Sequence, residues 1–292
     1  MRKVELAVVV WILLGCFVTS AFAAGKCRPD PLPPNPTVGQ IMKHWYEIKF
    51  TRFADDVSYD ICKVIMVDKS GFKREKISIR KRIILHGKHG FDYKDLVMIT
   101  YPEYTKGLAI LTWAYTDINK QNDLWLWLPS MKKVRKMSQA DEDDSFLGTE
   151  FTVEDVSTRR YGYESYQLLG EAEFPGYTCR YDKKLYFKGE PCWKIRAVPK
   201  RKNWYYAYRI LWVDKKTGVE IFAEYYNKLG KKFKEVFHYL DTPQNGCWST
   251  RIWEVYNYRT GHRDTIVISP ARYNTGLRER DFSPRVLERM EW

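Results

Sequence analysis

The sequence lacks the short motifs that mark most enzyme classes. It contains no Gly-x-Ser-x-Gly nucleophile elbow, no glycine-rich phosphate loop and no dinucleotide-binding fingerprint. No two of its six cysteines are spaced as Cys-x-x-Cys, so zinc ligation and thioredoxin-type chemistry have no support. Acidic residues are also scarce, 36 against 49 basic ones, which gives a formal net charge of +13. We therefore expect a basic protein that is not an enzyme and uses no cofactor.

The composition is that of a folded chain rich in β-structure. Hydrophobic residues make up 45% of the 292 residues, enough for an ordinary core. Aromatic residues reach 16%, and aromatic side chains fit the pleated, half-buried surface of a sheet. Collagen-like, coiled-coil and multi-pass membrane classes are excluded.

The N-terminus has the pattern of an export signal. Arg2 and Lys3 precede an apolar run over 6–18, and Ala21-Phe22-Ala23 supplies the small-x-small site that a signal peptidase cleaves. We predict that 1–23 is a signal peptide and that the mature chain begins at Ala24 in the periplasm.

Two alternatives to cleavage at Ala23 stay open. Leu13-Leu14-Gly15-Cys16 resembles a lipoprotein box, which would place a lipid anchor on Cys16, and residues 6–25 could remain as a single membrane anchor. The protein is exported in each case. Nucleic acid is therefore not an expected partner, and the excess positive charge favours anionic lipid headgroups.

Cysteine usage fits an oxidising compartment. Five cysteines remain after cleavage at Ala23, an odd number that leaves at least one unpaired or intermolecular. Cys179 and Cys192 flank an expected hairpin over 180–191, which makes a bridge between them a candidate. The full pairing stays open.

Residues 24–36 form a proline-rich leader before a single domain over 37–292. Asn35 and Pro36 are suited to the cap and first position of a helix. The helix is expected over 37–48, because apolar residues recur there at helical spacing: Val38, Ile41, Met42, Trp45 and Ile48.

From residue 57 onward the chain reads as successive short strands. Residues 77–80 alternate between apolar and polar, and apolar runs follow at 96–99, 108–114 and 124–128. Turn signals divide 205–240 into a meander of three strands, and Ser283-Pro284 opens a short helix that ends near Met290. The pattern predicts a mainly β (α+β) fold, an antiparallel barrel or strongly curved sheet with helices packed on it.

The strand at 124–128 is apolar on both faces. Leu124, Leu126 and Leu128 point one way, and Trp125 and Trp127 point the other. One face could line a lipid-binding cavity, or both could be used for core packing under helices. Together with Ile41, Met42 and Trp45, these five residues are the candidates for a lipid cavity or its lid.

The segment 123–156 carries a set of motifs. A strand ending in Leu-Pro at Pro129 is followed by a basic stretch containing Arg135, a Ser-Phe-x-Gly turn and a Glu-Asp pair. The residues that define the set are Pro129, Arg135, Ser145, Phe146, Gly148 and Asp155. This set resembles the outer-membrane lipoprotein-sorting-like proteins of the LolA/LolB-like superfamily.

The resemblance implies a half-open antiparallel β-barrel with helices packed on its concave side as a lid. It also implies a non-enzymatic periplasmic carrier that shields lipoprotein acyl chains, or another lipid, on the way to the outer membrane. Its partners would be an inner-membrane transporter and an outer-membrane acceptor. The alternative is an accessory module of an inner-membrane lipid exporter, with the same fold and no cargo of its own.

The sequence also contains a pair of histidines, an acidic run and two basic clusters. His86 and His89 have no nearby cysteine or carboxylate, so we expect a turn and no metal site. The acidic run 141–144 lacks the interleaved glycine of a calcium loop and reads as a solvated loop. The basic clusters at 200–202 and 231–234 are either solvated hairpin tips or contacts for anionic headgroups.

Overall fold

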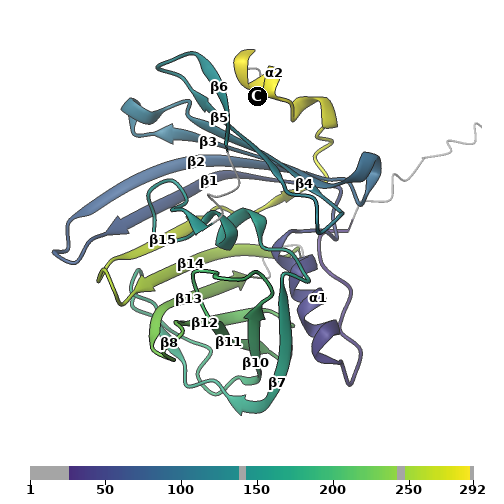
Figure 1. Ribbon diagram of the computed structural model, residues 1–292, viewed down its shortest axis with the longest axis vertical. Coiled ribbons are helices and arrows are strands. Elements are labelled where there is room, and N and C mark those ends of the chain that lie inside the picture. Colours follow the sequence, from purple (N-terminus) through teal and green to yellow (C-terminus); the bar gives the residue numbers. More distant parts are fainter. Residues whose placement is uncertain (1–25, 138–142, 242–246, 290–292) are drawn as a thin grey trace, which may run out of the picture.

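The computed structural model describes residues 26–137, 143–241 and 247–289 (Figure 1). The predicted signal peptide, Cys16, Asp141 and Glu142 lie outside these residues. Of the helices within them, none is long and apolar enough to cross a membrane.

One large antiparallel sheet dominates the molecule. Its strands follow in the order β6-β5-β4-β3-β2-β1-β15-β14-β13-β12-β11-β10-β7, and β16 pairs with β1 beside this path. Because β6 and β7 do not pair with each other, the sheet stays open, and the right-handed twist of its strands curves it into a half-barrel (Figure 1). This confirms the predicted fold class.

The strands of the large sheet are β1 (Asp56–Val67), β2 (Lys73–Ile84), β3 (Phe91–Tyr101), β4 (Ala109–Tyr115), β5 (Asp123–Leu128), β6 (Lys133–Met137), β7 (Glu164–Glu173), β10 (Pro191–Pro199), β11 (Tyr208–Asp214), β12 (Glu220–Tyr226), β13 (Lys232–Asp241), β14 (Ser249–Asn257), β15 (Arg263–Ile268) and β16 (Arg272–Tyr273). A separate two-stranded sheet pairs β8 (Tyr177–Thr178) with β9 (Leu185–Tyr186). The α-helices are α1 (Val38–Lys49) and α2 (Pro284–Arg289), and single helical turns occur at Lys88–Gly90, Glu103–Thr105, Glu154–Thr158 and Glu279–Asp281.

Helix α1 forms where its apolar spacing predicts it, with one difference at the cap. Thr37, rather than Asn35, is the N-cap, because its hydroxyl accepts from the Gln40 amide while the Gln40 side chain accepts from the Thr37 amide. This capping box satisfies two amides that the helix itself leaves unbonded. The buried face of α1 consists of Ile41, Met42, Trp45 and Ile48, and it packs into the main core.

Residues 143–163, which we call the lid segment, cross the concave side of the sheet (Figure 1). Their backbone makes one isolated bridge, between Ser145 and Thr152, and joins no strand of the large sheet. Four of their apolar side chains are buried in the same core as α1: Phe146, Phe151, Val153 and Val156.

Helix α2 lies on the other side of the sheet, away from the lid segment (Figure 1). Phe282 and Leu287 pack there against a second core formed by β3, β4 and β5, which includes Trp127. Of the two α-helices among the described residues, therefore, only α1 covers the concave face. Strands β3 to β5 are apolar on both faces because both are covered.

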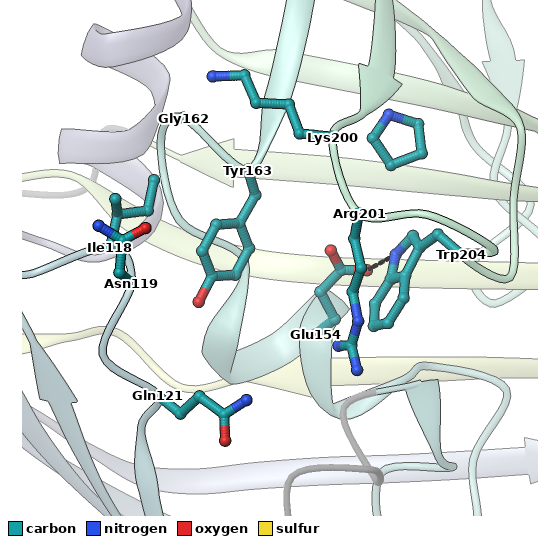
Figure 2. A pocket seen from close by; sticks show the side chains of 10 residues that line it. Ile118, Asn119, Gln121, Glu154, Gly162, Tyr163, Lys200, Arg201 and Trp204 are labelled. Carbon is teal, nitrogen blue, oxygen red and sulfur yellow. Dashed lines mark hydrogen bonds between the residues drawn. The ribbon is translucent and has the colours of Figure 1, made fainter.

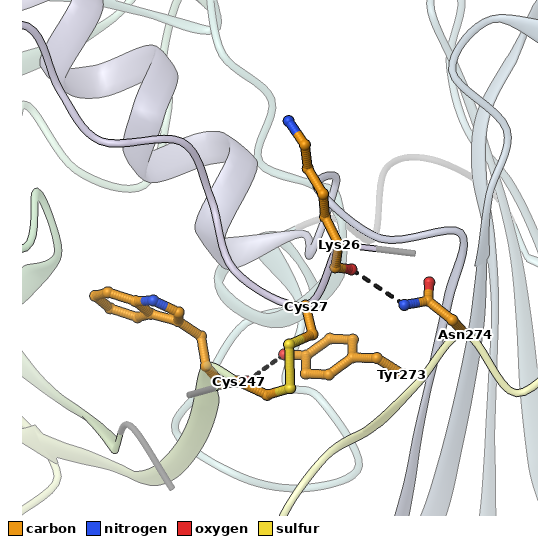
Figure 3. Close-up of a disulfide and its surroundings, with 6 residues drawn as sticks. Lys26, Cys27, Cys247, Tyr273 and Asn274 are labelled. Atoms are coloured by element: carbon orange, nitrogen blue, oxygen red, sulfur yellow. Dashed lines mark hydrogen bonds between the residues drawn. A yellow bond between two sulfur atoms is a disulfide. The ribbon is translucent and has the colours of Figure 1, made fainter. Parts of the chain in front are cut away.

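The disulfide joins Cys27 to Cys247, with 4.9 Å between the Cα atoms (Figure 3). It ties the proline-rich leader to the start of β14, where the Trp248 amide also donates to the Cys27 carbonyl. Cys179 and Cys192, the candidate pair from the sequence, are unpaired and buried. Cys179 lies beside the Glu254 carboxylate, whereas Cys192 is part of β10. The segment between them is therefore not a simple hairpin that pairs the two cysteines.

The three unpaired cysteines of residues 26–289 that the structure describes are expected to resist alkylation in the folded protein. Burial raises the pKa of the Cys62, Cys179 and Cys192 thiols to about 12, so almost no thiolate, the reactive form, is present near neutral pH. Iodoacetamide at about pH 8 should leave the native chain unmodified, and addition of urea without reductant should expose all three to labelling, read by intact mass. Rapid native labelling of Cys179 would contradict this placement.

Candidate functional site: the lidded concave face

The lid segment and α1 close over an apolar floor on the concave face. The floor is built from inward-facing side chains of the central strands, including Val64 of β1 and Val255 of β14, which are almost fully buried. The fully buried Phe151 of the lid segment packs beside Trp253 of β14, with 6.4 Å between the ring centroids. Apolar contact therefore holds the lid segment down.

The Ser-Phe-x-Gly motif forms a tight turn that aims Phe146 into this core. The Ser145 hydroxyl donates to the Thr149 carbonyl at 2.6 Å, and Gly148 has a φ of +82°, a conformation that glycine adopts without strain. The motif thus has a structural role in the lid segment, which sequence spacing alone does not show.

Polar bonds tie the lid segment to three strands. Lys76 of β2 donates to the Leu147 carbonyl at 2.6 Å. The Glu150 amide donates to Asp264 of β15 at 2.5 Å, and Asn257 of β14 donates to the Glu150 carboxylate at 2.6 Å. These bonds orient the lid segment without adding it to the sheet.

Asp155 is the central charge on the side of the lid segment that faces the sheet. Its carboxylate accepts from Lys234 of β13, from Arg159 at 2.9 Å and from the Tyr225 hydroxyl at 2.6 Å. Burial alone would raise its pKa, but Lys234 and Arg159 outweigh burial and hold the pKa of Asp155 well below its usual range. The group is ionised at neutral pH.

A second set of buried charges continues toward α1. Arg209 of β11 donates to both oxygens of Glu164 at 2.8 and 2.6 Å, and Glu220 lies 3.5 Å from the same guanidinium. Burial is opposed by Arg209, which lowers the pKa of Glu164 to about 2. We call the whole set the buried ionic cluster; its members are Glu154, Asp155, Arg159, Glu164, Arg209, Glu220 and Lys234.

His238 of β13 lies at the edge of this cluster, between Trp45 of α1 and Trp253. Burial lowers its pKa to about 4, against the opposing effect of Glu220. The unfolded histidine takes up a proton near pH 6.5, so His238 by itself should contribute about 2 kcal/mol of destabilisation between about pH 7.5 and pH 5. Asp264 acts in the opposite direction over this range, because burial raises its pKa to about 6. Urea unfolding at the two pH values checks this, and a His238→Gln variant should lack that part of the loss. Equal pH dependence in both proteins would contradict it.

A groove of about 980 Å³ lies beside the proline-rich leader, lined by its prolines together with Leu32, Trp193 and Trp248, and the cavities next to the lid segment are smaller. Beneath α1 a space of about 20 Å³ is lined by Lys49, Arg159, Glu164, Arg209 and other side chains, and it is too small for a lipid tail. A larger pocket of about 470 Å³ opens between the end of the lid segment and the loops that precede β5 and β11 (Figure 2).

That pocket has a mixed lining. Figure 2 shows Tyr163 on one side, with Arg201 and Trp204 on the other and Lys200 beside them. At its base the buried Glu154 carboxylate accepts from the Trp204 indole at 3.1 Å and from Arg159 at 3.0 Å. The pocket therefore touches the buried ionic cluster directly.

The structure separates the candidates on strand 124–128. Leu124 packs into the concave core with α1, whereas Trp127, only 2% exposed, packs against Phe282 and Leu287 on the outer face. Trp125 joins Trp127, and Leu126 and Leu128 are half-buried. The concave face is thus the leucine face, and the tryptophans support α2.

Two other motif residues lie after the end of β5 and on the edge strand β6. Pro129 lies where a Cβ placed on Gly107 would meet it, and Arg135 is exposed on the edge strand β6, opposite Leu126. His86 and His89 lie in the β2–β3 turn, as expected. Apart from Glu154 and Asp155 of the motif, the members of the buried ionic cluster were not predicted from the sequence. Lys234 belongs to the basic run 231–234, expected at a solvated tip or at lipid headgroups, but it is buried against Asp155. Arg209 shares the inward parity of Leu211 and Val213 along β11.

Comparisons with known proteins agree with this architecture. No curated protein matches the chain. Among solved structures, an outer membrane lipoprotein-sorting protein domain from Vibrio parahaemolyticus is 22% identical over 86% of this chain and 97% of its own, with a TM-score of 0.70. A DUF1329 family protein from Desulfovibrio piger is 23% identical over 84% and 98%, with a TM-score of 0.69. A LolA superfamily protein from Nitrosomonas europaea is 18% identical over 85% and 98%, with a TM-score of 0.60.

At these identities the likeness shows the fold. A family model whose description reads "Uncharacterized protein" matches residues 92–289, more than half of the chain. The chain therefore belongs to that family, and it has the LolA-like, lipoprotein-sorting type of fold that its motifs indicate.

Proposed function

We propose that the protein is a non-enzymatic periplasmic carrier that holds lipoprotein acyl chains, or another lipid, on its concave face. The observation that carries this proposal is the lid segment, an apolar cover that lies on an apolar floor yet joins no strand of the large sheet. Such a cover can lift and be replaced by an alkyl chain without breaking the sheet.

The free energy lost when the lid segment leaves the floor can be offset by the burial of an alkyl chain in its place. Burying one side chain such as Phe151 or Val156 is worth about 1.5–3 kcal/mol, and burying one methylene of a lipid is worth about 0.8 kcal/mol. A long acyl chain can therefore compensate for displacing the lid segment. The charges that the lid segment leaves behind, Lys234 above all, add a penalty to opening. A donor transporter at the inner membrane and an acceptor at the outer membrane would supply and remove the cargo.

The first experiment is to express the precursor with its own signal, purify it from the periplasm without detergent, and measure intact mass and extracted lipid. A chain beginning at Ala24 with stoichiometric lipid is the expected result. A lipid-free chain would contradict the carrier function, and added mass on Cys16 would show an anchored protein.

A matched pair of variants tests the site itself. Phe151→Leu shortens a side chain of the lid segment, and Phe282→Leu makes the same change on the outer face; both phenylalanines are at most 1% exposed. Because Phe151 competes with cargo, Phe151→Leu should raise the affinity for a fluorescent long-chain alkyl probe about fivefold, which corresponds to about 1 kcal/mol. Phe282→Leu should leave this affinity unchanged. Equal effects of the two variants would argue against binding under the lid segment.

A second candidate function is supported by the small cavity beneath α1. A filled, charged interior of this kind suits an accessory module of a lipid exporter, with no cargo of its own. This candidate predicts a lipid-free protein and no alkyl-probe binding by either phenylalanine variant.

A further inference from the structure

Three consecutive hairpin tips at one end of the sheet each expose a large apolar side chain. Phe72 in the β1–β2 tip is 63% exposed, Tyr258 in the β14–β15 tip is 45% exposed, and Leu229 in the β12–β13 tip is 91% exposed. Figure 1 shows the first two tips side by side at the left of the molecule. Large apolar side chains at successive tips are unusual on a surface that meets only water.

The tips are neighbours in space. A Cβ placed on Gly261 would lie 3.2 Å from the Cβ of Lys69, which joins the β14–β15 tip to the β1–β2 tip. The Lys232 amine lies 5.0 Å from the centroid of the Tyr258 ring, which joins the β12–β13 tip to the β14–β15 tip. We call residues 68–73, 227–232 and 258–263 together the docking rim.

The docking rim is also strongly basic. Its single acidic residue is Asp68, and its basic residues are Lys69, Lys73, Lys228, Lys231, Lys232, Arg259 and Arg263. Lys232 is paired with Glu224 and Glu235, whereas Lys69 and Lys231 lie exposed at the tips.

Loops at the other ends of the strands differ. The loops over 85–90, 116–122 and 214–219 together hold four lysines and two aspartates. Their one exposed large hydrophobic side chain is Ile118. The combination of apolar tips and a surplus of positive charge is therefore a property of this end of the sheet, where the β5–β6 tip also exposes Met131 beside Lys132 and Lys133.

We infer that the docking rim binds the surface of an anionic lipid bilayer. Each lysine or arginine near such a surface contributes about 1 kcal/mol of attraction. Phe72 and Leu229 can enter the boundary between headgroups and acyl chains, and an apolar and a basic signal together give firmer binding than either alone. The inference does not rest on the carrier function, since the docking rim needs no cargo.

Sedimentation with vesicles tests the docking rim directly. The mature chain should bind vesicles of phosphatidylglycerol and phosphatidylethanolamine and should not bind vesicles of phosphatidylcholine alone, and added salt should weaken the binding. The triple variant Lys69→Gln/Lys228→Gln/Lys231→Gln should reduce partitioning about 100-fold. The matched control Lys88→Gln/Lys120→Gln/Lys216→Gln, which removes equal charge from the other loops, should reduce it much less.

Insertion of the apolar tips into the bilayer is measured separately from the charge effect. A Leu229→Cys variant labelled with an environment-sensitive dye should shift its emission to the blue on anionic vesicles, and a labelled Leu168→Cys on the edge strand β7 should not. The Phe72→Ser/Leu229→Ser variant should bind about tenfold more weakly. Equal loss from the two triple-lysine variants, binding to phosphatidylcholine vesicles that matches the anionic ones, or no vesicle binding at all would overturn the inference. The last result would leave an acidic protein surface as the partner to examine.

Discussion

An Asp155→Ala variant is expected to lose about 3–5 kcal/mol of its free energy of unfolding. The substitution leaves Lys234 and Arg159 buried without the carboxylate that both contact, and it also removes the acceptor of the Tyr225 hydroxyl. An uncompensated charge in a core costs far more than the loss of a surface ion pair. Urea unfolding at neutral pH, followed by tryptophan fluorescence, measures the effect.

The control for this prediction is a double variant that also removes the charge of Lys234. In Asp155→Asn/Lys234→Met the unpaired lysine is gone, and the double variant should recover a large part of the loss. Because the pKa of Asp155 is held well below its usual value, its stabilising effect should be complete at neutral pH. The difference between wild type and Asp155→Ala should shrink only below about pH 4, as the carboxyl takes up a proton. A loss under about 1 kcal/mol for Asp155→Ala would show that the pair contributes little.

Removing the disulfide is expected to have the second large effect on stability. The bond joins residues 220 positions apart, so it restricts the unfolded chain over most of its length. The Cys27→Ser/Cys247→Ser variant should lose about 2–5 kcal/mol of stability. It should also free the leader, since Lys26 and Cys27 are held to the domain by the bond and by hydrogen bonds from Asn274 and Trp248 (Figure 3).

Limited proteolysis separates these two consequences. A protease that cuts after lysine should reach Lys26 in the double-serine variant and not in the oxidised wild type under native conditions, whereas the Arg28-Pro29 bond resists such proteases in both. The control, Cys179→Ala/Cys192→Ala, keeps the disulfide and should keep Lys26 protected. Protection of Lys26 in both variants would show that packing alone holds the leader.

The sequence by itself determined the parts of the fold that depend on local pattern. The apolar spacing of Ile41, Met42, Trp45 and Ile48 specifies α1 with its buried face, because side chains three and four apart lie on one side of a helix. Turn residues and alternation specify the meander of β11, β12 and β13. The motif set around Ser145 and Asp155 indicated the LolA-like fold, which the comparisons bear out.

The tertiary structure decided what depends on contacts far apart in the chain. Alternation assigns Leu124 and Trp127 to opposite faces of β5, but only the packing of α2 shows that the tryptophan face is the outer one. Likewise the pairing of Cys27 with Cys247, and the meeting of Asp155 with Lys234, join positions 220 and 79 residues apart. No local pattern encodes such pairs, because they arise only when the twisted sheet brings the leader, the lid segment and the strands together.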